Sequence, residues 1–197
     1  MLDHPLISGL ITLAFLLVIG YITKLDMADI TGLAKKAAKK GMQGVATQLD
    51  YQLIAPRTPD QQGGLQKTVQ GIEIRVDADK SRIQIEFKRP LGMRLSSLSQ
   101  NDFDLGGLQA VNFSLAALND FFPLRALQPA LHKQQNTVEL LLLPLVEAFD
   151  NRQTKHLYIK DEYLRLAFAH RNYLPPELLI KALPILENAA KELAAMK

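Results

Sequence analysis

Residues 71–87 have the sequence GIEIRVDADKSRIQIEF, and this stretch decides the fold class. Apolar and polar residues alternate through both halves, and the apolar set is Ile72, Ile74, Val76, Ile83, Ile85 and Phe87. A period of two is typical of strands with one buried and one wet face. Residues 77–81 (DADKS) have the composition of a turn. We therefore predict an antiparallel hairpin here.

A second hairpin is predicted over residues 155–168, KHLYIKDEYLRLAF. Its apolar residues also alternate with polar ones, on either side of a turn at Lys160, Asp161 and Glu162. Two further strands are expected, at 51–55 (YQLIA) and at 91–95, where Leu91, Met93 and Leu95 repeat the alternation after Pro90.

Within residues 51–197, helices are predicted at three places. Residues 114–122 have apolar residues near helical spacing, and Pro123 could open a second helix with Leu124, Leu127 and Leu131 on one face. Pro175 and Pro176 precede a leucine-rich final helix, which we expect Pro184 to break or kink.

The middle of the chain is harder to assign. Residues 101–107 suggest an extended piece and a turn. The leucine-rich stretch 137–149 fits either a buried strand or a core helix, and Pro144 argues against one unbroken element. Because helices and strands come in blocks, we predict an α+β domain with an antiparallel sheet packed against helices over residues 51–197.

The N-terminal segment is strongly apolar. From Pro5 to Thr23 no residue is charged, and a helix of this length nearly spans the hydrocarbon core of a bilayer. A cleaved signal peptide is disfavoured because the first four residues carry no Lys or Arg. A buried core helix is disfavoured because the stretch is apolar on every face. We predict a retained transmembrane anchor over residues 1–25.

Charge bias predicts the orientation of this anchor. No Lys or Arg precedes it, whereas five lysines follow within about 20 residues. The positive-inside rule then predicts a single-pass protein of the bacterial cell inner membrane, with its N-terminus outside and its C-terminal domain in the cytoplasm.

Residues 26–50 are predicted to form a basic amphipathic connector helix. Its lysines, Lys35, Lys36, Lys39 and Lys40, lie opposite the apolar face on a helical wheel. One interpretation is binding to the anionic inner leaflet, worth about 1 kcal/mol per lysine. The other is a solvated connector whose lysines serve only as the topogenic signal, favoured by the helix-weakening glycines Gly32, Gly41 and Gly44.

Composition excludes several kinds of chemistry. The chain has 197 residues and no cysteine, so it lacks disulfides, cysteine-ligated metals and thiol catalysis. The net charge of +3, without a dense basic stripe or interleaved aromatic residues, argues against nucleic-acid binding. Phosphate-loop, dinucleotide-binding, zinc-protease and serine-hydrolase motifs are all missing from the sequence.

Few residues remain as candidates for catalysis. His156 and His170 flank the second hairpin and could approach each other, although solvated ends of the hairpin are the simpler interpretation. The acidic pairs Asp77 with Asp79, Asp102 with Asp104, and Asp161 with Glu162 sit in turn-like sequence. General acid–base catalysis needs a convergent partner, which none of these pairs shows.

We therefore expect a non-enzymatic protein without cofactor, metal or catalytic residues. The leading hypothesis is an interaction or scaffolding domain presented at the membrane to an unidentified protein partner. Two alternatives stay open: a small-ligand or lipid-binding domain with an apolar pocket, and an enzyme that uses Asp102, Asp104, His156 or His170. The alternatives predict a sizeable cavity or a convergent cluster, respectively.

Overall fold

The computed structural model describes residues 36–56, 63–77, 81–98, 104–149, 152, 154–169 and 174–196. The predicted transmembrane anchor lies outside these residues. Within them, none of the helices combines the length and the apolar character needed to cross a membrane. The chain divides into two compact units, residues 1–40 and 41–197, and the fold described here is that of the second unit.

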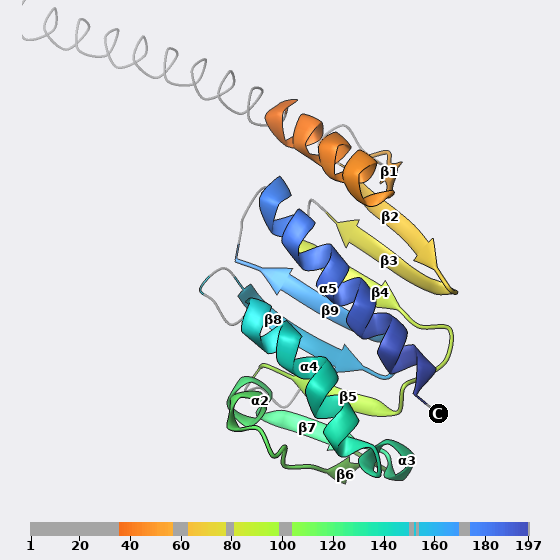
Figure 1. Cartoon of the computed structure of the whole chain (residues 1–197), viewed down its shortest axis with the longest axis vertical. Helices are drawn as coiled ribbons and strands as arrows, with labels where there is room; N and C mark the ends of the chain where they lie inside the picture. Colours follow the sequence, from red (N-terminus) through yellow and green to blue (C-terminus); the bar gives the residue numbers. More distant parts are fainter. Residues whose placement is uncertain are drawn as a thin grey trace, which may run out of the picture. The chain divides into compact units, whose positions relative to one another are not determined.

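One antiparallel sheet of nine strands forms this unit, in the order β1-β2-β3-β4-β9-β8-β5-β7-β6 (Figure 1). The strands are β1 (Gln52–Ile54), β2 (Gly64–Val69), β3 (Ile72–Asp77), β4 (Arg82–Glu86), β5 (Met93–Ser96), β6 (Gln109–Ala110), β7 (Leu124–Leu127), β8 (Thr154–Lys160) and β9 (Tyr163–Phe168). The α+β class with an antiparallel sheet is therefore confirmed.

Both predicted hairpins are present. β3 pairs with β4, with Ile74 opposite Ile85, and β8 pairs with β9, with Ile159 opposite Leu164. The hairpins join edge to edge, since β4 pairs with β9 and Ile85 also lies opposite Leu164. This register places the alternating apolar residues of four strands on one face, where the hydrophobic effect holds them together.

The predicted helix from Pro123 is wrong. Leu124–Leu127 is strand β7, which pairs with β5 so that Leu127 lies opposite Met93. A short apolar segment suits either structure locally, and here pairing with a distant strand decides. Strands β2 and β6 were not predicted, because neither shows a clear alternation of apolar residues.

The described helices are one over residues 36–49, α2 (Ala116–Phe121), α3 (Pro129–His132), α4 (Gln135–Phe149) and α5 (Pro176–Ala195). The open choice for residues 137–149 is settled as helix. The predicted breaks at Pro144 and Pro184 are wrong, because α4 and α5 continue through both prolines, whereas a kink at Pro184 stays a prediction. Both prolines are exposed, so their rings do not disturb the buried side of either helix.

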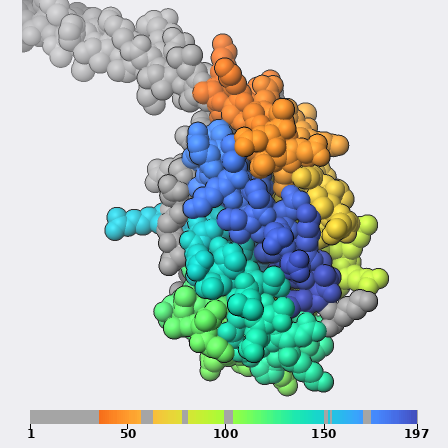
Figure 2. All heavy atoms as spheres, viewed as in Figure 1, coloured from red at the N-terminus to blue at the C-terminus, as the bar shows by residue number. Residues whose placement is uncertain are grey.

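Helices α4 and α5 pack against each other and cover the apolar face of the sheet (Figure 1). In the space-filling view, α5 in blue and α4 in teal form this outer layer (Figure 2). The core cluster joins the strand residues to fully buried leucines of both helices, such as Leu142 and Leu186. It also includes Val45 and Ala46, so the second half of the predicted 26–50 connector belongs to the same compact unit.

Candidate functional site

The predicted lysine patch is partly described. Lys36, Lys39 and Lys40 are exposed on the helix over residues 36–49, and Lys35 lies outside the described residues. Exposed ammonium groups can meet a charged surface without further rearrangement. Membrane-surface binding by these lysines stays a prediction.

The candidate catalytic residues do not form a described cluster. Asp104 is exposed and ion-paired to Arg94, with 4.0 Å between Oδ2 and Nη1. The partner of Asp104, Arg94, lies opposite Lys160 at the far end of β8. Lys160 is four residues along the strand from His156, so Asp104 and His156 are well beyond hydrogen-bond distance of each other.

Asp79, Asp102 and His170 lie outside the described residues. Within the described part of the chain, no three His, Asp or Glu side chains are placed to hold a metal ion.

Asp77 and Asp161, one from each hairpin, are engaged in ion pairs. Asp77 accepts hydrogen bonds from Arg75 Nε at 3.0 Å and Arg82 Nε at 2.9 Å. Burial works to raise the pKa of the Asp77 carboxyl, but the bonds from Arg82 and Arg75 outweigh it and hold the pKa below its usual value. Asp161 pairs with Arg94 at 2.7 Å. These carboxylates stabilise hairpin ends.

The sheet face opposite the helix layer is polar. The residues that alternate with the core residues on the strands include Gln66, Glu73, Arg75, Asp77, Arg82, Gln84, Arg94, Tyr158, Tyr163 and Arg165. Neighbouring strands are cross-linked here by side chains, for example Gln66 Nε2 donating to Glu73 Oε1 at 2.9 Å. We call this surface the polar sheet face. Among the described residues no helix lies on it (Figure 1).

An aromatic and arginine cluster occupies the centre of the polar sheet face. The Arg165 guanidinium carbon lies 5.3 Å from the Tyr158 ring centroid and 4.8 Å from that of Tyr163. Both separations are within cation–π range. Arg165 Nε and Nη2 donate to Gln84 Oε1 at 2.9 and 2.6 Å. The His156 ring stacks on Tyr158 with centroids 5.2 Å apart. This network holds each ring and the guanidinium in one orientation.

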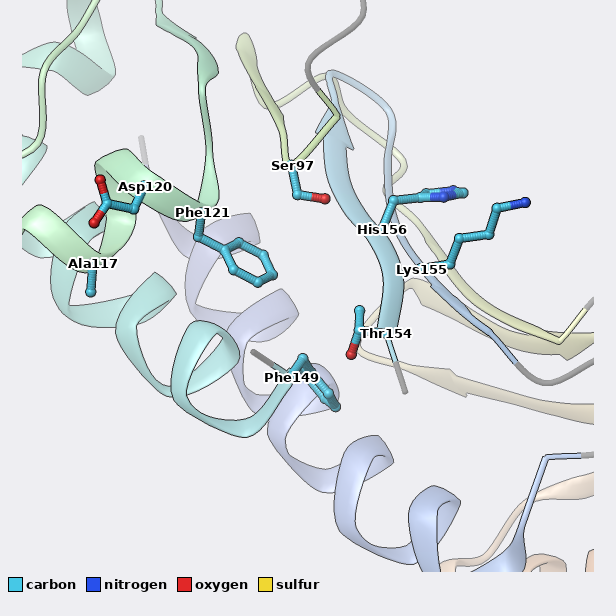
Figure 3. A pocket seen from close by; sticks show the side chains of 8 residues that line it. All are labelled: Ser97, Ala117, Asp120, Phe121, Phe149, Thr154, Lys155 and His156. Atoms are coloured by element: carbon cyan, nitrogen blue, oxygen red, sulfur yellow. The ribbon is translucent and has the colours of Figure 1, made fainter. Parts of the chain in front are cut away.

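A pocket of about 440 Å³ lies beside the first residues of β8 (Figure 3). β8 has a bulge here, because Thr154 pairs with Phe168 while His156 pairs with the next residue, Ala167. The bulge turns these two side chains to opposite faces of the sheet. Figure 3 shows Phe121, Phe149 and Thr154 around a gap on one side of the strand, and His156 and Lys155 extending from the other side.

Two buried polar atoms of this pocket, Thr154 Oγ1 and His156 Nδ1, have no hydrogen-bond partner among the described residues. Burial lowers the pKa of His156, and the positive charges of Lys155 and Arg165 lower it further, so the imidazole is neutral at pH 7. Buried polar groups are normally paired, so these two mark an unusual place in the fold.

A second pocket, of about 360 Å³, shares the lining residues Phe149 and Thr154 with the first. It runs under the end of α4 to the start of α5, where Leu178 and Lys181 line it. Of the pocket residues, sequence reasoning singled out His156 alone. The others come from several separate elements, and no local pattern in the sequence marks them.

Comparison with known proteins adds little. No protein-family model matches the chain, and no curated protein matches it. A solved structure with a similar arrangement is the mycobacterial trehalose monomycolate transport factor A, TtfA. The similarity has a TM-score of 0.48 and 8% sequence identity, and it covers 81% of this chain and 95% of that one. A similarity this distant carries no functional conclusion.

Proposed function

We propose that this chain is a single-pass membrane protein whose α+β domain docks a protein partner through the polar sheet face, without catalysis and without a cofactor. The domain then lies on the cytoplasmic side of the inner membrane. The membrane anchor localises the domain, and the sheet presents the binding surface.

The anchor is supported by the sequence. Residues 5–23 are uncharged, and Lys36, Lys39 and Lys40 follow on the side that the positive-inside rule assigns to the cytoplasm. The same three lysines are exposed, so they are free to attract anionic headgroups.

The observation that carries docking is the partly exposed pair of Tyr163 and Arg165, which is held against the buried ring of Tyr158. Tyr and Arg dominate the binding energy of protein interfaces because they offer large contact areas and several hydrogen bonds. Here both rings and the guanidinium are already fixed by mutual contacts and by Gln84. A surface with fixed side chains loses less conformational entropy on binding than a flexible one.

Site-specific crosslinking in cells tests the proposal. A benzophenone amino acid is placed at Thr68 or Glu86, which are exposed on the polar sheet face, in the full chain. The matched control has the same residue at Glu147, which is exposed on α4. We expect one partner, identified by mass spectrometry, that is captured from Thr68 and Glu86 and not from Glu147.

The same experiment in a chain without residues 1–25 separates anchoring from docking. We expect this chain to leave the membrane fraction and the yield of crosslinked partner to fall. Capture of the same partner from all three positions, or of none from the polar sheet face, would contradict docking there. Retention of the shortened chain in carbonate-washed membranes would contradict the anchor.

A further inference from the structure

Two pockets share the lining residues Phe149 and Thr154. We propose that they act together as one groove, which binds the hydrocarbon chain of a single-chain anionic amphiphile of the fatty-acid type, with the carboxylate at its β8 end beside Lys155. The proposal does not depend on docking at the polar sheet face, since it concerns a different surface.

The shape of the groove suits an elongated ligand. Its two parts, of about 440 and 360 Å³, share Phe149 and Thr154, and their other lining residues differ. Each part falls within the range of about 300–1,000 Å³ that is typical of small-molecule sites. Three separate elements, α2, the end of α4 and the start of α5, line the groove, together with β8 and β9.

The lining is apolar along the middle of the groove. Phe121 and Phe149 flank the first part, and Phe168, Ala148 and Leu178 line the second. Phe121 and Leu178 are partly exposed although both pack against the core cluster. A hydrocarbon chain laid along these side chains would remove their exposed area from water, which stabilises the complex through the hydrophobic effect.

Polar groups gather at the β8 end. The buried Thr154 hydroxyl has no partner among the described residues. Ser97 Oγ accepts the Leu157 amide at 2.8 Å. That bond leaves the Ser97 hydroxyl hydrogen to be donated, and a carboxylate accepts such hydrogen bonds through both oxygens.

A cation stands at the edge of this end, because Lys155 lines the pocket and is exposed. Figure 3 shows its side chain extending from the side of β8 away from Phe121 and Phe149, so a carboxylate paired with it lies at the mouth of the groove. The acidic residue of this pocket, Asp120, comes from α2, and Figure 3 shows its carboxylate directed away from Thr154. At the other end Glu177 and Lys181 have opposite charges, so the carboxylate is expected at Lys155.

Photolabelling tests the groove in the full chain reconstituted into phosphatidylcholine vesicles. The probe is a palmitate analogue with a diazirine in its chain, and labelled peptides are identified by mass spectrometry. We expect label on peptides that contain Phe121, Phe149 and Leu178, competed at least tenfold by excess palmitate and much less by methyl palmitate. Label on residues 5–23 alone, or equal competition by the ester, would overturn the proposal.

Two variants locate the site. Ala117→Trp places an indole in the first part of the groove, and Ala130→Trp places one on α3, where the alanine is exposed. We expect at least a fivefold loss of groove label in A117W and no change in A130W. If A117W is folded by circular dichroism and still labels like the unaltered chain, the groove is excluded as the binding site.

If A117W does not fold, a second variant, Lys155→Glu, tests the site, because Lys155 is exposed. We expect this variant to lose the preference for palmitate over methyl palmitate. An unchanged preference would overturn the proposal.

Discussion

Glu139 is a buried carboxylate that supports the loop before α2. Its side chain accepts hydrogen bonds from the Ser114 backbone amide and from Gln135 Nε2, both at 2.8 Å, and the residue is only 3% exposed. Burial works to raise the pKa of this carboxyl, but the bonds from Ser114 and Gln135 outweigh it, and the pKa falls below its ordinary value of 4.5. The charged form is therefore the one that the fold stabilises.

We expect Glu139→Gln to lower the free energy of unfolding by about 1–3 kcal/mol at pH 7, because a charge-assisted bond to a buried amide is weakened. A carboxyl with a lowered folded-state pKa stabilises the fold above its unfolded-state pKa. The difference between the two proteins should therefore shrink as pH falls below about 4.5 and through the folded-state pKa. Urea denaturation from pH 7 to pH 3 measures it.

Glu147→Gln is the control for this prediction, because Glu147 is exposed on the same helix. It should change the stability by less than about 0.5 kcal/mol. A difference for Glu139→Gln that grows as the pH falls would show that the carboxylate does not support the fold in its charged form.

At the scale of elements, α4 tolerates an interior proline. Pro144 lacks the N–H that would bond the carbonyl of Leu140, and both residues are exposed. The buried face of the helix, with Leu142, Leu145 and Val146, holds it against the core regardless. Packing thus outweighs a local preference that made the sequence ambiguous here.

We expect Pro144→Ala to stabilise the protein by about 2 kcal/mol. Alanine removes a penalty of about 3 kcal/mol in a helix interior, and the more flexible unfolded chain takes back about 0.4–1 kcal/mol. Thermal unfolding followed by circular dichroism measures the change, with Glu147→Ala as an exposed control on α4. A decrease in the melting temperature of the Pro144 variant would show that the proline supports the native helix geometry.

A second contact between elements fixes the end of the helix over residues 36–49. Lys67 Nζ on β2 donates to the Leu49 carbonyl at 3.0 Å and pairs with Glu187 of α5 at 3.5 Å. It also lies 5.1 Å from the Tyr51 ring centroid. Burial raises the pKa of the Tyr51 hydroxyl, and the Glu187 carboxylate raises it further, so this tyrosine stays neutral.

Lys67→Met should lower the free energy of unfolding by about 1–2 kcal/mol, mainly through the lost bond to the helix carbonyl, since a partly exposed ion pair adds little. Guanidinium denaturation of this variant and of Lys181→Met, an exposed lysine on α5, gives the comparison. Equal stabilities of the two variants would contradict a role for Lys67 at this contact.

At the scale of the whole molecule, the folded unit begins before β1. Val45 is fully buried and Ala46 is 7% exposed, and the Tyr51 amide bonds the Ala46 carbonyl at 2.9 Å. A chain that starts at Tyr51 loses this packing, whereas a chain that starts at Gly41 keeps it.

We expect the chain from Tyr51 to be less stable than the chain from Gly41 by at least about 3 kcal/mol, because burying one valine-sized side chain is already worth about 1.5–3 kcal/mol. Calorimetry of both chains provides the measurement. A chain that starts at Lys36 serves as the control and should match the one from Gly41. Equal melting temperatures for all three would show that residues 41–50 add nothing to the fold.

The candidate sites were much less predictable than the fold. Arg165 and Tyr158 belong to a hairpin whose outward positions follow from the alternation, so their place on the polar sheet face was implicit in the sequence. The groove was not, because Phe121, Phe149 and Thr154 come from three elements that are adjacent only in the folded chain.

The sequence by itself determined both hairpins, the final helix and the α+β class, because alternation and amphipathic spacing arise from neighbours a few residues apart. The tertiary structure alone decided that Leu124–Leu127 is a strand and that residues 41–49 join the core. It also decided that a bulge in β8 directs the Thr154 side chain toward the groove. These outcomes depend on contacts between residues far apart in the chain, whose energies exceed the weak local preferences at those positions.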